Sequence, residues 1–132
     1  MSRSSVSRLR VRYAETDQIG VAWHGNVFAW FEVGRTDLLR ELGTTYRELE
    51  GEGLRLPVVE ATARYHHPVL YDDLVEVRTR LSSQSGARVG FEYEIHRPDA
   101  DGPLVTGSTE HAAVDSGGRP RRLPPALRRL LS

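Results

Sequence analysis

Apolar residues recur with two different spacings along the chain, and the change of spacing separates a helical part from a strand-rich part. From Asn26 to about Leu42 they fall three or four positions apart, which predicts an amphipathic helix. The stripe facing the core should consist of Val27, Phe31, Gly34, Leu38 and Leu42, with Trp30 beside it. Asn26 is a favourable N-cap, and Gly43 stands where a C-terminal glycine is expected.

Beyond Pro57 the spacing changes to two, which is typical of strands. Four alternating segments are VVEATARYHH (58–67), LVEVRTRLSS (74–83), RVGFEYEIHR (88–97) and LVTGSTEHAAV (104–114). A shorter one, LRVRYAET (9–16), predicts a strand ahead of the helix. Turn-forming residues join the four long segments, so an antiparallel meander is the simplest arrangement.

Two short segments complete the order of elements. TTYRELEGEG predicts a second helix with Thr45 and Glu48 spaced as a capping box, and LPPALRRLLS predicts a final helical turn. One strand, one long apolar helix and then four strands indicate an α+β fold in a single domain over residues 1–132. The edge and the second face of such a sheet need cover, which favours a homo-oligomer.

Composition excludes several kinds of chemistry. Acidic and basic residues balance at 18 each, so the net charge gives no argument for nucleic acid or a membrane as partner. Every basic residue among them is Arg, which excludes Schiff-base and P-loop lysines, and the absence of Cys excludes disulfides and thiolate nucleophiles. No segment is typical of a signal peptide or a membrane span, so we expect a cytoplasmic protein.

The segment RYAETDQIGVAWHGNVFAWFEVGR (12–35) places an acid, a glycine-bearing turn and a His-Gly-Asn sequence directly before the long helix. With the later segment ARYHHPVLYDDLVEV it resembles the hotdog-fold acyl-CoA thioesterases, in particular the 4-hydroxybenzoyl-CoA thioesterase family and its short-chain acyl-CoA relatives. The resemblance runs from about Val11 to Leu123 and is most specific in TDQIGVAWHGN. One departure is YDD, where the family has a glycine-aspartate turn.

This resemblance implies a hotdog fold, in which a five-stranded antiparallel sheet wraps around a long central helix. It also implies hydrolysis of an acyl-CoA thioester without a metal or cofactor, since coenzyme A is part of the substrate. The family's dimers imply active sites at a subunit interface. We therefore expect a dimer or a dimer of dimers, most simply a homotetramer.

Three positions are expected to serve catalysis, and the resemblance assigns the roles of two of them, Asp17 and His24. Asp17 would be the nucleophile or the general base, and the sequence does not separate attack through a mixed anhydride from activation of water. The backbone amide at His24 would polarise the carbonyl, while its side chain, Tyr or His in the family, has a supporting role. Gly25 would let the carbonyl oxygen approach the free N–H groups and positive dipole end of the helix N-terminus.

Three further residues are candidates for binding substrate. Arg88 corresponds to a position where relatives contact the CoA phosphate, and Arg suits phosphate well. Glu60 could face the site from a neighbouring subunit, or could be the cross-strand partner of an Arg. Asn26 could contact substrate besides capping the helix.

Other interpretations of these and neighbouring residues stay open. Asp17 could serve only an Asx-type turn. Glu32, inside the helix, is interpreted as structural, although another hotdog branch uses a helical glutamate as nucleophile. His66 and His67 are consecutive on a predicted strand and should point to opposite faces, so we expect no metal site.

Competing functions are a non-catalytic acyl-CoA-binding module and an acyl-carrier-protein thioesterase. Retention of Asp17 beside a glycine-containing helix start argues against the binding module. A hotdog dehydratase would need a different histidine and acid motif, and a serine hydrolase would need a G-x-S-x-G sequence. The chain contains neither.

Overall fold

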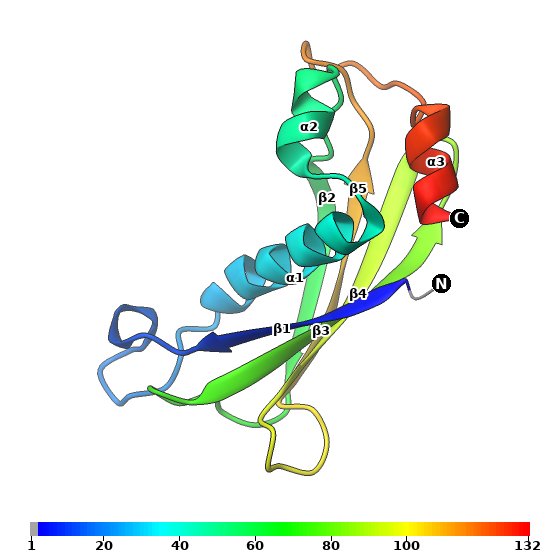
Figure 1. The fold of residues 1–132 in the computed structure, drawn as a ribbon. Helices are drawn as coiled ribbons and strands as arrows, with labels where there is room; N and C mark the ends of the chain where they lie inside the picture. Colours follow the sequence, from blue (N-terminus) through cyan, green and yellow to red (C-terminus); the bar gives the residue numbers. More distant parts are fainter. Residues whose placement is uncertain (1–2) are drawn as a thin grey trace.

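A five-stranded antiparallel sheet lies against one long helix (Figure 1). The computed structural model describes residues 3–132. Its elements are β1 (Ser4–Arg10), the 3₁₀ turn η1 (Tyr13–Glu15), α1 (Asn26–Leu42), α2 (Tyr46–Gly51), β2 (Val58–Tyr65), β3 (Leu74–Gln84), β4 (Arg88–His96), β5 (Val105–Ala112) and α3 (Pro125–Leu131). All four long strands and the long helix were predicted from the hydrophobic pattern and are confirmed.

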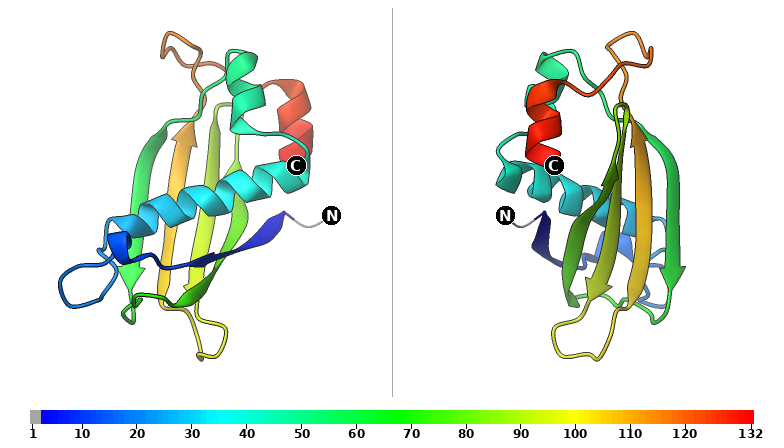
Figure 2. Two further views of the ribbon diagram at one scale, coloured as in Figure 1. Left: turned by 60° about the vertical axis from the view of Figure 1, so that its left-hand side comes forward. Right: turned by 90° about the vertical axis from the view of Figure 1, so that its right-hand side faces the viewer.

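The strand order is β1-β3-β4-β5-β2, with every neighbouring pair antiparallel. The predicted simple meander holds for β3, β4 and β5 but is wrong for β2, which pairs with β5 at the edge opposite β1. Residues 66–73 cross the sheet end between β2 and β3 instead of forming a hairpin. α1 lies across one face, on β1, β3 and β4 (Figures 1 and 2). This is the hotdog fold, as expected.

The apolar stripe of α1 is the main contact between helix and sheet. Its buried members are Val27, Trp30, Phe31, Gly34, Leu38 and Leu42, as predicted. Phe31 stacks on Tyr93 of β4, with ring centroids 4.2 Å apart and planes 6° apart. Gly34 lets the helix approach β3 closely, because a Cβ at that position would collide with the hydroxyl of Thr79. α1 ends at Leu42 and is capped by Gly43, whose φ of 105° suits glycine.

The first strand begins and ends earlier than the prediction of residues 9–16. Two of the inward-facing residues of β1 are the buried serines Ser5 and Ser7, so this strand carries only a weak hydrophobic alternation. The chain then leaves the sheet and turns in η1, where the carboxylate of Glu15 accepts a hydrogen bond from the N–H of Arg12 at 2.8 Å. A local polar contact therefore replaces the extended backbone that the alternation suggested.

The two short helices form where the local sequence predicted them. The hydroxyl of Thr45 accepts a hydrogen bond from the N–H of Glu48 at 3.1 Å, so the Thr45 half of the capping box predicted for α2 is confirmed. α3 confirms the predicted helical turn at the C-terminal end. Among residues 3–132, no helix has the length and hydrophobicity needed to span a membrane.

The turn before β3 contains the one residue other than glycine, among residues 3–132, that has a positive φ. Asp72 has a φ of 67°, in the left-handed region that favours glycine. It belongs to the YDD sequence that departs from the family's glycine-aspartate turn. Asp73 supports the turn, since its Oδ2 accepts hydrogen bonds from the N–H of Leu70 and from Arg97, both at 2.9 Å.

A chain of polar side chains runs through the core beneath α1. The hydroxyl oxygens of Tyr93 and Thr109 are 2.6 Å apart, and the Thr109 hydroxyl lies 2.9 Å from Nε2 of His111. Nδ1 of His111 lies 2.9 Å from the carbonyl of Leu56, which only accepts, so Nδ1 carries the proton. Burial lowers the pKa of His111 to about 4, so the ring is neutral at physiological pH.

Candidate active site

Asp17 opens a short loop that connects η1 to α1. Its N–H donates to the carbonyl of Val21 at 2.8 Å, and Thr16 and Ala22 form an antiparallel bridge at the base of the loop. Its side-chain Oδ1 accepts hydrogen bonds from the N–H groups of Ile19 and Val21, at 2.9 and 3.1 Å. The Asx-type turn considered from the sequence is therefore present.

The turn engages only one oxygen of this carboxylate. Oδ2 of Asp17 accepts no hydrogen bond from the part of the chain that the structure describes, and the side chain is exposed. The two backbone donors to Oδ1 restrict the orientation of the carboxylate while leaving Oδ2 accessible. An Asx turn is thus compatible with a chemical role for Asp17, which stays a prediction.

The start of α1 offers unused backbone donors. Within residues 3–132, the N–H groups of His24 and Gly25 donate to no acceptor. Gly25 is the N-cap residue, with φ −67° and ψ −23°, and no side chain caps the helix there. A Cβ at Gly25 would collide with the indole ring of Trp23, so a larger residue there would displace this exposed side chain. Free N–H groups at a helix N-terminus stabilise negative charge, as an oxyanion site needs.

Asn26 does not cap α1, so that prediction is wrong. It is the first residue of the helix, and its Nδ2 donates to the main-chain carbonyl of Glu15 at 2.6 Å. The amide side chain is therefore engaged with the segment that precedes the Asp17 loop. A role for Asn26 in binding substrate stays a prediction.

The imidazole of His24 lies between two aromatic side chains. Its ring centroid is 5.0 Å from that of Trp23 and 6.4 Å from that of Tyr65, the latter ring being nearly perpendicular. The Tyr65 hydroxyl donates to the main-chain carbonyl of His24 at 2.8 Å. The exposed ring itself makes no hydrogen bond to the described residues, and its supporting role in chemistry stays a prediction.

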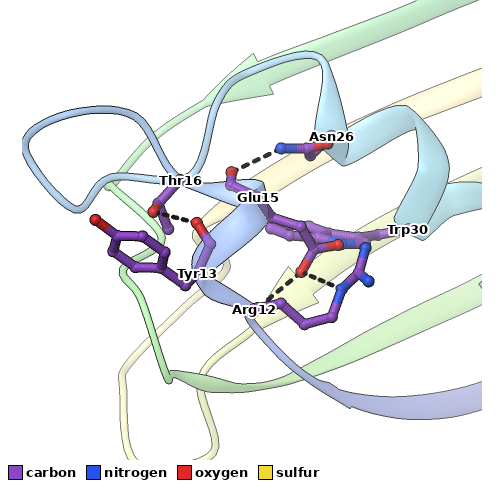
Figure 3. Close-up of polar contacts among 6 residues, drawn as sticks. All are labelled: Arg12, Tyr13, Glu15, Thr16, Asn26 and Trp30. Carbon is purple, nitrogen blue, oxygen red and sulfur yellow. Dashed lines mark hydrogen bonds and ion pairs between the residues drawn. The ribbon is translucent and has the colours of Figure 1, made fainter.

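A buried carboxylate next to the loop was not recognised from the sequence. Glu15 is 9% exposed, and its Oε2 accepts a hydrogen bond from Nε1 of Trp30 at 2.9 Å (Figure 3). Burial by itself would raise the pKa of Glu15, but hydrogen bonds from Arg12 and Trp30 and the charge of Arg12 lower it below the ordinary value. The available signal was Trp30, because a buried indole N–H usually finds an acceptor.

Arg88 and Glu60 lie at the end of the sheet opposite this loop within one chain. Arg88 begins β4 in register with Ala112, and Glu60 lies near the start of β2. The register partner of Glu60 is Glu110, so a cross-strand pair with an Arg is wrong. Both candidate side chains are exposed, and one chain alone does not bring them to Asp17.

A second polar group missed by the sequence analysis is the buried Arg35 on α1. Its Nε has no hydrogen-bond partner in the described chain, and its Nη2 is 4.0 Å from Oε1 of Glu32. This ion pair is consistent with the structural role expected for Glu32. Arg35 lines a cavity of about 660 Å³ with Tyr46 and with Pro57, which directly precedes β2.

The two adjacent histidines lie beyond the strand rather than on it. β2 ends at Tyr65, so His66 and His67 belong to the following turn, and the argument from alternating strand faces does not apply to them. Nε2 of His66 is 2.9 Å from the hydroxyl of Thr106, which accounts for one ring nitrogen. The expectation of no metal site stays a prediction.

Comparisons with known proteins identify the class of protein to which this fold belongs. Residues 11–131 match the thioesterase-like superfamily. The chain is 36% identical to the putative acyl-CoA thioesterase YneP of Bacillus subtilis, covering 84% of this chain and 80% of that protein. The chain therefore belongs to the thioesterase-like superfamily.

Solved structures support the same assignment. The DHNA-CoA thioesterase of Staphylococcus aureus superposes with a TM-score of 0.91 at 34% identity, covering 96% of this chain and 87% of that chain. A 4-hydroxybenzoyl CoA thioesterase superposes with a TM-score of 0.87 over 99% of this chain and 100% of that chain. At 17% identity this second likeness shows the fold alone. Resemblance to hotdog thioesterases is therefore confirmed.

Proposed function

We propose that this protein hydrolyses acyl-CoA thioesters to a free acid and coenzyme A, with Asp17 as the reacting carboxylate. The proposal rests on a carboxylate with one oxygen free of hydrogen bonds and on two backbone N–H groups that have no acceptor. Oδ1 of Asp17 is held by two backbone N–H groups, whereas the N–H groups of His24 and Gly25 are free at the helix N-terminus. The acyl-CoA thioesterase relative YneP supports the substrate class.

Two routes use the same residues. In the general-base route, Asp17 takes a proton from water, the water oxygen attacks the carbonyl carbon, and the carbon–sulfur bond breaks to release CoA thiolate. In the nucleophilic route, a carboxylate oxygen of Asp17 attacks, CoA thiolate leaves, and water then cleaves the mixed anhydride. In both routes the negative charge on the carbonyl oxygen develops near the amides of His24 and Gly25.

The active site is proposed to be completed by a second copy of the chain. β2 is an edge strand, and every residue in it except Ala63 is exposed. An exposed edge strand that includes Val58, Val59 and Tyr65 is suited to pairing with another strand. Antiparallel pairing of two β2 strands would put the Val58 end of one copy beside the Tyr65 end of the other.

That pairing explains why the candidate residues are separated in one chain. Glu60 lies near the start of β2, whereas Tyr65, at its end, contacts His24. Glu60 and Arg88 of one copy would thus approach the Asp17 loop of the other, with Arg88 serving the CoA phosphates. The sheet also carries a groove of about 800 Å³, whose lining includes Arg78 and Arg80 of β3 and Glu92 and Glu94 of β4 among several serines and threonines. Charge complementarity there would support a dimer of dimers.

The remaining expectations fit this proposal. Hydrolysis by a carboxylate and backbone amides requires neither metal nor cofactor, and the substrate would be cytoplasmic acyl-CoA. The protein would act without nucleic acid or membrane partners.

The test is release of free thiol from a panel of aliphatic and aromatic acyl-CoAs, with the same acyl groups on acyl-carrier protein run in parallel. We expect saturable turnover of at least one acyl-CoA, faster than that of the matched carrier-protein thioester. Faster turnover of the carrier-protein thioesters would identify an acyl-carrier-protein thioesterase. Binding of CoA without turnover of any thioester would identify the non-catalytic binding module and overturn the proposal.

A further inference from the structure

The side chain of Glu15 is a buried carboxylate that the chemistry above does not use. Its Oε1 accepts the N–H of Arg12 at 2.8 Å and lies 3.5 Å from Nε of the same residue. Its Oε2 accepts Nε1–H of Trp30 at 2.9 Å. Figure 3 shows the Glu15 side chain between these two groups, one before the turn and one on α1. Both carboxylate oxygens are therefore engaged.

The main-chain carbonyl of Glu15 is engaged as well. It accepts the N–H of Trp23 at 2.8 Å and Nδ2–H of Asn26 at 2.6 Å. Trp23 directly follows the loop that Asp17 opens, and Asn26 is the first residue of α1. Glu15 thus binds both ends of the loop: it lies two residues before Asp17, and it contacts the residue before His24.

The contacts require a carboxylate rather than a neutral group. Glu15 accepts from a backbone N–H on one oxygen and from an indole N–H on the other. A glutamine would have to direct its NH₂ group at one of these donors, so at least one hydrogen bond would be lost. A buried donor left without an acceptor destabilises the arrangement.

We propose that Glu15 is a positioning residue that sets the Asp17 carboxylate against the free amides of His24 and Gly25, with Trp30 and Asn26 as its anchors on α1. This inference rests on the proposed function. Its physical basis is that small displacements of a reacting group are costly: about 1 Å of misplacement can lower a rate 10²-fold. Substrate binding would depend little on Glu15, because its carboxylate is buried and contacts only the protein.

The test compares Glu15→Gln and Trp30→Phe with the wild type in steady-state hydrolysis of the preferred acyl-CoA, well below each melting temperature. Trp30→Phe removes the indole donor and keeps a ring in the core. The matched control is Asp37→Asn, because Asp37 also links two elements: it accepts a hydrogen bond from Ser7 of β1 at 2.6 Å, away from the loop.

We expect both test variants to lower kcat about 10- to 100-fold while KM changes less than about twofold. Asp37→Asn should lower the melting temperature and leave kcat unchanged. The inference is overturned if Glu15→Gln and Trp30→Phe fold and keep the wild-type kcat, or if Asp37→Asn loses as much kcat as they do. An inactive wild type would instead refute the proposed function, so the two failures are distinguishable.

Discussion

The hydroxyl of Tyr65, at the end of β2, donates a hydrogen bond to the main-chain carbonyl of His24 at 2.8 Å. This contact joins the free edge of the sheet to the residue whose amide is proposed to stabilise the oxyanion. The hydrogen bond restrains the carbonyl of the peptide that joins His24 to Gly25, while the N–H of the same peptide, that of Gly25, stays free. The hydrogen bond thereby connects the edge strand to the candidate active site within one chain.

Tyr65→Phe should therefore lower kcat/KM by about two- to fivefold, since a neutral hydrogen bond contributes about 1 kcal/mol. Steady-state thioester hydrolysis measures the effect. Tyr71→Phe is the control, because Tyr71 is also half-exposed but its hydroxyl bonds to no described residue. Equal activity of Tyr65→Phe and wild type would show that the contact is not needed to hold the His24 peptide.

Two exposed valines on opposite sheet edges test the proposed dimer. Val59 on β2 and Val6 on β1 are each 47% exposed in the single chain, so an aspartate at either position should be tolerated by the monomer. Val59→Asp should shift the protein to monomer in light scattering coupled to size exclusion, because a buried unpaired charge is costly. Val6→Asp should keep the β2-paired dimer. A dimer that survives Val59→Asp would contradict pairing through β2.

The buried His111 predicts a loss of stability in mild acid. Its pKa falls from 6.5 to about 4 through burial, so the unfolded chain binds more protons than the folded one between these values. The contribution of the neutral, buried His111 to the free energy of unfolding is fully present above pH 6.5. It is lost as the pH falls towards 4, and the loss amounts to about 3 kcal/mol. Urea unfolding at pH 4 to 7 measures it.

His111→Gln should be less stable at pH 7 and should flatten this dependence. His67→Gln, at an exposed position, should keep the wild-type slope. If His111→Gln retained the full acid dependence, another group would have to cause it.

The left-handed Asp72 predicts a stabilising substitution. Asp72→Gly removes the steric cost of a Cβ at φ 67° and should raise the free energy of unfolding by up to about 1 kcal/mol. The ion pair that it loses with Arg10 is exposed and 4.0 Å long, so it contributes little. Asp72→Ala keeps the Cβ and should bring no gain. A lower stability of Asp72→Gly in urea unfolding would refute this explanation of the turn.

The elements that sequence reasoning located well are those with a strict hydrophobic period. α1 satisfies a helical stripe over its whole length, and β4 alternates without interruption from Val89 to Ile95. β1 was misplaced because serines occupy two of its inward positions. The position of β2 beside β5 was not predictable, since alternation specifies which face is buried but not which strand is the neighbour.

The residues of the candidate site likewise fall into those that the sequence identified and those that it missed. Asp17, His24 and Gly25 lie close in sequence and could be named from the motif. Glu15 was missed because its burial depends on the indole of Trp30, which no local pattern reveals. The contact of Tyr65 with His24 joins residues far apart in the chain, and only the folded sheet brings them together.

The most direct test of the central claim is kcat of Asp17→Asn on the preferred acyl-CoA. An asparagine keeps the Oδ1 acceptor that the N–H groups of Ile19 and Val21 require, so the loop should stay folded and the melting temperature should stay near that of wild type. We expect kcat to fall by about 10²–10⁴-fold, because the group that attacks or deprotonates water is gone. Wild-type turnover by this variant would show that Asp17 serves only the turn.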